Sequence, residues 1–127
     1  MSTSDACRVL LVDDTPEIRY VLRALLGGVQ SLDVIGEAKD GREAIDLAEH
    51  HQPDVIVLDV SMPIMDGFEA LPHITSVAPA STVVMYTAHG SPENRARAMS
   101  LGAHHFVEKG GNPTGIVETV EQSCAEG

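Results

Sequence analysis

The sequence has few cysteines and few basic residues, and it lacks a long hydrophobic run. Its two cysteines, Cys7 and Cys124, lie near opposite ends of the chain and do not have the spacing of metal ligands. Disulfide frameworks and zinc sites both use several cysteines at short, regular spacings, so this pattern argues against both. We therefore expect Cys7 and Cys124 to be reduced and to have no assigned role.

The shortage of basic residues argues against nucleic-acid binding. The chain has 8 Lys and Arg against 19 Asp and Glu, a formal net charge of −11, and no run of Lys or Arg forms a basic stripe. No apolar stretch approaches the ~20 residues that a transmembrane helix needs, and the start of the chain does not resemble a signal sequence. We expect a soluble cytoplasmic protein that binds neither DNA nor membranes.

The apolar residues indicate one domain in which strands and helices alternate. A length of 127 residues with 43% hydrophobic residues is typical of a single compact domain. Five short apolar runs have the length of strands, and segments with helical spacing separate them. This alternation predicts a doubly wound α/β fold, with a five-stranded parallel sheet and helices on both faces. The predicted strands cover residues 9–12, 34–35, 55–58, 83–86 and 106–107.

Each predicted helix begins with a recognisable capping or proline signal. The third helix differs because Pro72 falls beyond its first turn, where proline removes a backbone hydrogen bond and clashes with the preceding turn. We expect this helix to be short or kinked. The helix starts are Thr15-Pro16, Asp40-Gly41, Asp66-Gly67, Ser91-Pro92 and Asn112-Pro113.

Polar residues lie at the ends of four of the five predicted strands. Asp13 and Asp14 follow the first run, Asp59 follows the third, Thr87 ends the fourth and Lys109 ends the fifth. In a doubly wound sheet, functional residues gather at the carboxyl ends of the strands, near the point where the strand order reverses. We therefore expect three carboxylates, one hydroxyl and one amine to meet at one edge.

This set of groups indicates phosphoryl chemistry. Three carboxylates that lie close together repel one another unless a cation neutralises them, and Mg²⁺ is the hard divalent ion that suits oxygen ligands. A carboxylate beside Mg²⁺ and a lysine can act as a nucleophile toward a phosphoryl group. Taken singly, Asp14 would be read as a helix cap and Lys109 as a surface charge, but the five residues in this order favour a functional site.

The chain resembles the receiver domains of bacterial two-component response regulators. The segments VLLVDDTPEIR, VIVLDVSMPIMDGFEAL, VVMYTA and GAHHFVEK carry the resemblance, in this order and spacing. The resemblance covers about residues 8–124 and implies a (βα)5 flavodoxin-like receiver fold. We expect residues 1–127 to form one receiver domain, which is either a stand-alone protein or part of a longer regulator.

The resemblance implies a role for each of the strand-end residues. Asp59 would accept the phosphoryl group. Asp14 would bind Mg²⁺ directly, Asp13 would hold it through water, and the main-chain carbonyl of Ser61 would be a further ligand. Lys109 would pair with one phosphoryl oxygen, and the hydroxyl of Thr87 would move onto another.

The resemblance also implies a switch and a set of partners. Phe106 matches the family's switch aromatic, which turns inward when Thr87 moves and changes the surface formed by the fourth helix, fifth strand and fifth helix. The phosphoryl donor would be a sensor histidine kinase or a phosphotransfer protein, and the output would be an unidentified protein partner or a homodimer. The chain departs from the family where Gly110 replaces the usual proline after Lys109.

Three other functions fit the sequence less well. A phosphatase of the haloacid dehalogenase type also places a nucleophilic Asp after an apolar strand, but it needs a second Asp where this chain has Ser61. A nucleotide-binding domain needs a glycine-rich loop after the first strand, which this chain lacks. A receiver-like interaction module that works without phosphate is the remaining alternative, and the altered loop after Lys109 keeps it open.

Overall fold

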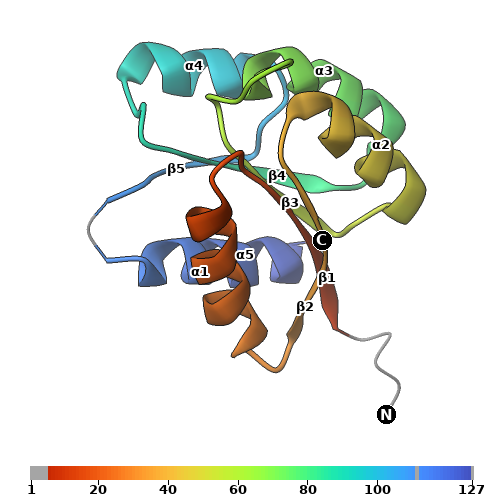
Figure 1. Cartoon of the computed structure of the whole chain (residues 1–127), viewed down its shortest axis with the longest axis vertical. Helices are drawn as coiled ribbons and strands as arrows, with labels where there is room; N and C mark the ends of the chain where they lie inside the picture. Colours follow the sequence, from red (N-terminus) through yellow and green to blue (C-terminus); the bar gives the residue numbers. More distant parts are fainter. Residues whose placement is uncertain (1–5, 111, 127) are drawn as a thin grey trace.

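A computed structural model describes residues 6–110 and 112–126 of the chain. These residues form a parallel sheet with the strand order β2-β1-β3-β4-β5 (Figure 1). The strand order reverses at β1 and β3, which lie side by side in the sheet, as expected of a doubly wound α/β fold. The prediction of this fold class is therefore confirmed. The strands are β1 (Cys7–Val12), β2 (Leu32–Ala38), β3 (Val55–Leu58), β4 (Thr82–Thr87) and β5 (His105–Glu108).

Helices cover both faces of the sheet. In Figure 1, α2, α3 and α4 lie above the sheet, and α1 and α5 lie below it. Each face has its own cluster of buried apolar side chains, so the sheet separates two layers of core. The helices are α1 (Pro16–Gly27), α2 (Gly41–His51), α3 (Gly67–Val77), α4 (Pro92–Ser100) and α5 (Thr114–Glu126).

The central strands match their predicted positions more closely than β2 does. All four residues of β3 are buried, as expected of a strand covered on both faces. The strand β2 has seven residues where the sequence predicted two. It lies at an edge of the sheet, and within it only Leu32 and Ala38 are fully buried. Because β2 contains polar residues, its short apolar run predicts only part of the strand.

Three of the predicted caps form, and a fourth does so only in part. The hydroxyl of Ser91 accepts a hydrogen bond from the backbone N–H of Asn94 in α4 at 3.1 Å. The carboxylates of Asp40 and Asp66 accept hydrogen bonds from the third residue of α2 and of α3, at 2.9 and 2.8 Å respectively. Thr15 occupies the N-cap position of α1, but its side chain makes no capping bond. The carboxylate caps fix where α2 and α3 begin, and the start of α3 in turn fixes the loop that follows β3.

The helix α3 is not shortened by Pro72, so that part of the expectation was wrong. It runs for 11 residues from Gly67 to Val77, the same length as α2. Leu71 and Ile74 on either side of the proline are fully buried, and their burial holds the helix on the sheet. The side chain of Pro72 itself is exposed.

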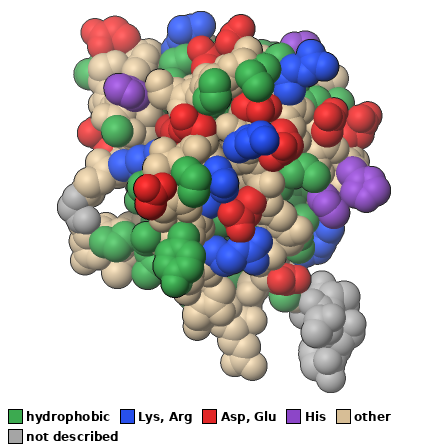
Figure 2. Space-filling view, in the orientation of Figure 1, with side chains coloured by type: hydrophobic (Ala, Val, Ile, Leu, Met, Phe, Trp, Pro, Cys, Tyr) green, Lys and Arg blue, Asp and Glu red, His purple; other side chains and the backbone are tan. Residues whose placement is uncertain are grey.

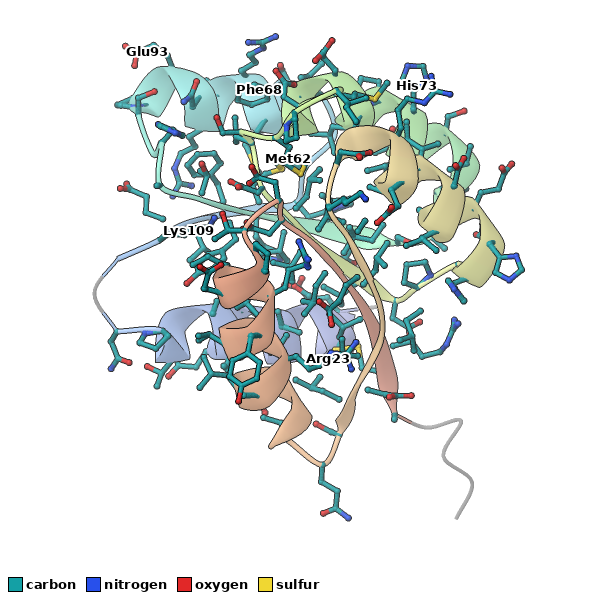
Figure 3. The ribbon with its side chains drawn as sticks, in the orientation of Figure 1. Arg23, Met62, Phe68, His73, Glu93 and Lys109 are labelled. Atoms are coloured by element: carbon teal, nitrogen blue, oxygen red, sulfur yellow. A yellow bond between two sulfur atoms is a disulfide. The ribbon has the colours of Figure 1, made fainter. Side chains whose placement is uncertain are left out.

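The two cysteines form a disulfide, which corrects the expectation that both are reduced. Cys7 begins β1 and Cys124 lies in the last turn of α5, with a Cα–Cα distance of 5.9 Å (yellow bond in Figure 3). The two residues are 117 positions apart. Their contact arises because α5 packs against the face of the sheet that carries Cys7, and sequence spacing alone does not reveal it. The bond ties the last helix to the first strand.

The surface mixes charges of both signs. On the face shown in Figure 2, basic side chains alternate with acidic ones, and apolar side chains gather over α1. Tyr20 and Val21 of α1 are 76% and 47% exposed. None of the helices in the described ranges is long and apolar enough to cross a membrane.

Candidate functional site

Asp13 and Asp59 lie side by side at the carboxyl edge of the sheet. Each follows the last residue of its strand, and those last residues, Val12 of β1 and Leu58 of β3, are register partners. The backbone N–H of Asp59 donates to the carbonyl of Val12 at 3.0 Å. Asp13 and Asp59 are buried, at 2% and 5% relative exposure. The structure thus brings two carboxylates together at the point where the strand order reverses.

Asp14 completes a cluster of three carboxylates. One carboxylate oxygen from each of Asp13, Asp14 and Asp59 lies within 4.8 Å of the other two. Asp14 is exposed, whereas Asp13 and Asp59 are buried. A cation that approaches from solvent would therefore meet Asp14 first and the two buried carboxylates behind it.

Lys109 is the amine of the site. Its Nζ lies 2.6 Å from Oδ2 of Asp13 and 3.3 Å from Oδ2 of Asp59. Its backbone N–H donates to the carbonyl of Thr87 at 2.8 Å, which fixes the end of β5 beside the end of β4. In Figure 3, Lys109 lies close to the start of α1, at the same edge of the sheet as Met62. One lysine thus bridges the two buried carboxylates.

The loop after Lys109 contains the departure noted in the sequence. No peptide bond in the described residues is cis, so the bond between Lys109 and Gly110 is trans. Gly110 has a φ of 104°, a conformation that glycine adopts readily. Gly111 lies outside the described residues. Lys109 therefore reaches the carboxylates although the usual proline is absent.

The pKa values of Asp59 and Lys109 are both raised, but for different reasons. Burial raises the pKa of Asp59, the negative charge of Asp13 raises it further, and Lys109 only partly offsets these effects. Burial acts to lower the pKa of Lys109, but its hydrogen bond to Asp13 and the charges of both carboxylates outweigh this, and the pKa is raised. The cluster thus keeps its lysine charged and makes ionisation of Asp59 less favourable than that of an ordinary aspartate.

Thr87 and the loops beside it complete the site. Thr87 ends β4 and is fully buried, and its Oγ1 accepts a hydrogen bond from the backbone N–H of His89 at 3.0 Å. An open cleft of about 510 Å³ lies at this edge of the sheet. Ser61 and His89 line it together with Asp59 and Lys109. The cleft leaves Asp59 accessible to a small group although the side chain is largely buried.

Phe106 lies in the core of the upper layer. It sits in β5, it is 6% exposed, and it belongs to the same apolar cluster as Met85 and Ala98. The ring therefore occupies the inward position that the family resemblance associates with the switched state.

Arg19 supports the site but was not identified from the sequence. Its guanidinium donates to the main-chain carbonyl of Asp13 at 2.6 Å and forms a salt bridge with Glu37 of β2. The bond to the carbonyl helps to fix the backbone from which the Asp13 side chain projects. Arg19 lies six residues after Asp13, within α1. The only signal in the sequence was its place in the first turns of the helix that follows the acidic pair.

The carboxylate cluster suits a hard divalent cation. The donor atoms are all carboxylate oxygens, the kind of ligand that Mg²⁺ prefers. The ammonium group of Lys109 contacts the cluster, but a single positive charge only partly neutralises three carboxylates. Asp13, Asp14 and Asp59 therefore fit the Mg²⁺ site that the sequence predicted.

The chain is similar to proteins of one family over almost its whole length. The response regulator receiver domain profile matches residues 9–121. The nitrate/nitrite response regulator protein NarL of Escherichia coli K12 is 30% identical over 125 residues, which cover 98% of this chain but 58% of that protein. The chemotaxis protein CheY of Thermotoga maritima is 31% identical over 115 residues, 91% of this chain and 95% of that protein.

A solved structure shares the fold described above. The signal receiver domain of the NarL response regulator from Mycobacterium tuberculosis superimposes with a TM-score of 0.89 and 34% sequence identity, covering 95% of this chain and 98% of that one. The profile, the relatives and the shared (βα)5 flavodoxin-like architecture agree. The chain belongs to the response regulator receiver domain family of two-component systems.

Proposed function

We propose that Asp59 is the phosphoryl acceptor of this receiver domain. The observation that carries this proposal is the position of its carboxylate, which opens onto the cleft and lies 3.3 Å from the ammonium of Lys109. The side chain is held from behind, because Oδ1 accepts a hydrogen bond from the backbone N–H of Val60 at 2.8 Å. Asp13 and Asp14 lie beside it as metal ligands, so acceptor and cation site share one edge of the sheet.

The transfer makes one bond and breaks one. An oxygen of the Asp59 carboxylate attacks phosphorus, and a new O–P bond forms. The bond from phosphorus to the donor breaks, and its electron pair leaves with the donor, which is the imidazole of a phosphohistidine or the carboxylate of a small acyl phosphate. Lys109 pairs with one phosphoryl oxygen. The reaction modifies this chain itself, and water later hydrolyses the product to Asp59 and inorganic phosphate.

Asp13, Asp14, Asp59 and the main-chain carbonyl of Ser61 would hold Mg²⁺. When bound, the ion supplies positive charge that neutralises the phosphoryl oxygens. The side chains of Asp13 and Asp59 already project from adjacent strand ends, and Asp14 contributes its oxygen from the solvent side. With the charge of Asp13 shared in this way, Lys109 would leave its short contact with that carboxylate and pair with the phosphoryl group.

Thr87 and Phe106 would transmit the modification. The Thr87 hydroxyl now accepts a hydrogen bond from His89 and would donate to a phosphoryl oxygen after moving toward Asp59. A phosphoryl group adds negative charge and acceptor oxygens that only this arrangement satisfies, so it shifts the balance between two states. Phe106 adjoins the surface made by α4, β5 and α5, where we propose that a protein partner or a second copy binds.

The donor would be a sensor histidine kinase or a phosphotransfer protein of the cytoplasm. The helix α1 begins close after the acidic pair and exposes Tyr20 and Val21, and we propose that this helix contributes to docking of the donor. The chain spans 58% of the NarL protein to which it is similar, so the output of that longer protein is not transferred to it. We propose that residues 1–127 act as a single receiver domain.

Phosphoryl uptake tests the proposal. The protein is incubated with a small acyl phosphate, with and without Mg²⁺, and the intact mass is measured. We expect one phosphoryl adduct that requires Mg²⁺ and is absent in Asp59→Asn. Asp46→Asn is the matched control, because Asp46 is an exposed carboxylate on α2 outside the cleft. An adduct that persists in Asp59→Asn, or no adduct from either an acyl phosphate or a phosphorylated kinase domain, would contradict the proposal.

A further inference from the structure

The helix α4 is held on the domain by little apolar burial. It has nine residues, and Ala98 is the one that is fully buried. Its two arginines, Arg95 and Arg97, are exposed, yet the guanidinium group of each lies over an aromatic ring. The position of α4 therefore depends on these arginine contacts more than on a buried apolar stripe.

Each of the chain's two phenylalanines lies beneath an arginine of α4. The Cζ atom of Arg95 lies 5.3 Å from the ring centroid of Phe106, and that of Arg97 lies 4.4 Å from the ring centroid of Phe68. Both distances are within the range of a cation–π contact. Phe106 belongs to β5 and Phe68 to α3, so the two arginines attach α4 to two different neighbours (Figure 3 labels Phe68).

Arg95 holds Phe106 by two contacts at once. One guanidinium nitrogen donates to the main-chain carbonyl of Phe106 at 3.2 Å, while the guanidinium carbon lies over the ring of the same residue. Within the described ranges, neither Arg95 nor Arg97 forms a salt bridge. The charge of Arg95 is therefore directed at Phe106 and not at a carboxylate.

We propose that Arg95 is a positioning residue that holds the ring of Phe106 in its inward position. Phe106 is 6% exposed in this structure and packs with Met85 and Ala98. Rotation of the ring toward solvent would move it out from under the guanidinium and break the cation–π contact. The hydrogen bond to the carbonyl keeps the guanidinium in place over the inward position.

The consequence for signalling rests on the proposed function. A ligand shifts a two-state equilibrium only by its differential affinity for the two states. If the ring of Phe106 is mostly inward already, phosphorylation can increase the inward population only slightly. Arg95 also joins Phe106 to α4, so the ring and the helix move together. Loss of Arg95 would uncouple the Phe106 ring from α4. It would also allow the ring to populate the outward position in the unmodified protein.

Fluorine NMR tests the proposal directly. Because the chain has two phenylalanines, labelling with para-fluorophenylalanine gives two resonances, one for each arginine contact. The change in shift between H₂O and D₂O reports how exposed each fluorine is. Spectra are recorded on unmodified, metal-free protein, and Phe68→Leu and Phe106→Leu assign the two signals.

In Arg95→Ala we expect the Phe106 resonance to move and its solvent isotope shift to increase, with the Phe68 resonance unchanged. Arg97→Ala is the matched control and should move only the Phe68 resonance. Arg95→Lys keeps a cation above the ring and should return the Phe106 signal toward its wild-type position. Circular dichroism verifies that each variant is folded.

Two results would overturn the proposal. One is a Phe106 resonance that keeps its position and its low solvent isotope shift in folded Arg95→Ala. The other is an equal displacement of the Phe106 resonance by Arg97→Ala, which would make the effect a general loosening of α4. Since these spectra need neither Mg²⁺ nor phosphate, a failure of Asp59 to accept a phosphoryl group is detected separately, by mass, and leaves this test unaffected.

Discussion

The Nζ atom of Lys109 lies 2.6 Å from Oδ2 of Asp13, closer than its 3.3 Å separation from Oδ2 of Asp59. The lysine that follows the last strand thus contacts the proposed metal-ligand carboxylate of the first strand more closely than the proposed acceptor. A divalent cation and Lys109 would compete for the charge of Asp13.

Replacing Lys109 by alanine should strengthen Mg²⁺ binding and weaken phosphoryl uptake. Without the ammonium, three carboxylates attract the cation unopposed, and we expect the dissociation constant to fall by about fivefold, or roughly 1 kcal/mol. Loss of the group that pairs with the phosphoryl oxygens should slow uptake by about 100-fold. Calorimetric titration with Mg²⁺ and mass spectrometry measure the two effects.

Lys39→Ala is the control for this prediction, because Lys39 is the other of the chain's two lysines and is exposed outside the cleft. It should change neither quantity appreciably. Weaker Mg²⁺ binding in Lys109→Ala would show that Lys109 organises the carboxylates and does not compete for them.

Replacing Asp59 by asparagine should stabilise the metal-free protein at neutral pH. Burial and the charge of Asp13 raise the pKa of Asp59 above its ordinary value of 3.8, so the folded state binds this proton more tightly than the unfolded state does. While Asp59 is protonated, below about pH 3.8, its burial does not reduce the stability of the fold. Stability is lost as the pH rises through the pKa of Asp59 in the folded state. An asparagine side chain cannot ionise, so the Asp59→Asn variant avoids this loss.

Urea unfolding in the presence of a chelator, at a series of pH values, measures this difference. The variant should exceed the wild type in stability at neutral pH, and the gap should close as the pH falls toward 3.8. Adding Mg²⁺ at neutral pH should stabilise the wild type more than Asp59→Asn. A gap that does not change with pH would assign the effect to packing and not to charge.

Breaking the disulfide should destabilise the domain without removing the site. Cys7 and Cys124 are 117 residues apart, and a cross-link over so long a loop restricts the unfolded chain, which stabilises the fold by roughly 2–5 kcal/mol. The double variant Cys7→Ser/Cys124→Ser should lose this amount in urea unfolding and should keep phosphoryl uptake. Because a reductant breaks the disulfide without a substitution, the wild type is measured with and without dithiothreitol.

Reductant should lower the unfolding midpoint of the wild type to that of the double serine variant, whose own midpoint it should not alter. If reductant leaves the wild-type midpoint unchanged and two thiols titrate in the untreated protein, the cysteines are reduced and the original expectation from the sequence holds.

Gly67 fixes the turn that leads from Asp59 into α3. A Cβ atom on Gly67 would overlap the carbonyl oxygen of Asp59, a backbone atom that cannot move aside cheaply. We expect Gly67→Ala to destabilise the domain by about 1–3 kcal/mol and to reduce phosphoryl uptake by displacing the acceptor. Thermal unfolding and intact mass measure these effects.

Gly115→Ala is the matched control in α5, because no neighbouring atom lies within 4 Å of the position that a Cβ would take there, and alanine favours helix. It should be neutral or slightly stabilising. Equal destabilisation by the two substitutions would mean that the close approach of Gly67 to Asp59 has no special role.

The sequence predicted the sheet and the site because both depend on where buried strands end. The apolar run that ends at Leu58 is buried throughout. The carboxylate of Asp59, which follows it, therefore lies at the carboxyl edge of the sheet. Asp13, Asp59 and Thr87 are correspondingly among the few buried polar residues of the described chain. Patterns of this kind are local in sequence and therefore readable from it.

Other features depend on contacts between distant segments and escaped prediction. The cysteine pair joins the first strand to the last helix, and Arg19 holds the carbonyl of Asp13 from the next element. Arg95 covers Phe106 although an exposed arginine on a short polar helix is typical of a solvated surface. The length of α3 was underestimated because burial of its apolar residues outweighs the local effect of Pro72.

Locating the phosphoryl group on the chain tests the central claim most directly. After incubation with an acyl phosphate and Mg²⁺, the protein is treated with borohydride, which reduces an aspartyl phosphate to homoserine, and its peptides are sequenced by mass spectrometry. We predict homoserine in place of Asp59 and at no other aspartate. Homoserine in place of Asp13 or Asp14, or phosphate retained on His89, would contradict the assignment of Asp59 as the acceptor.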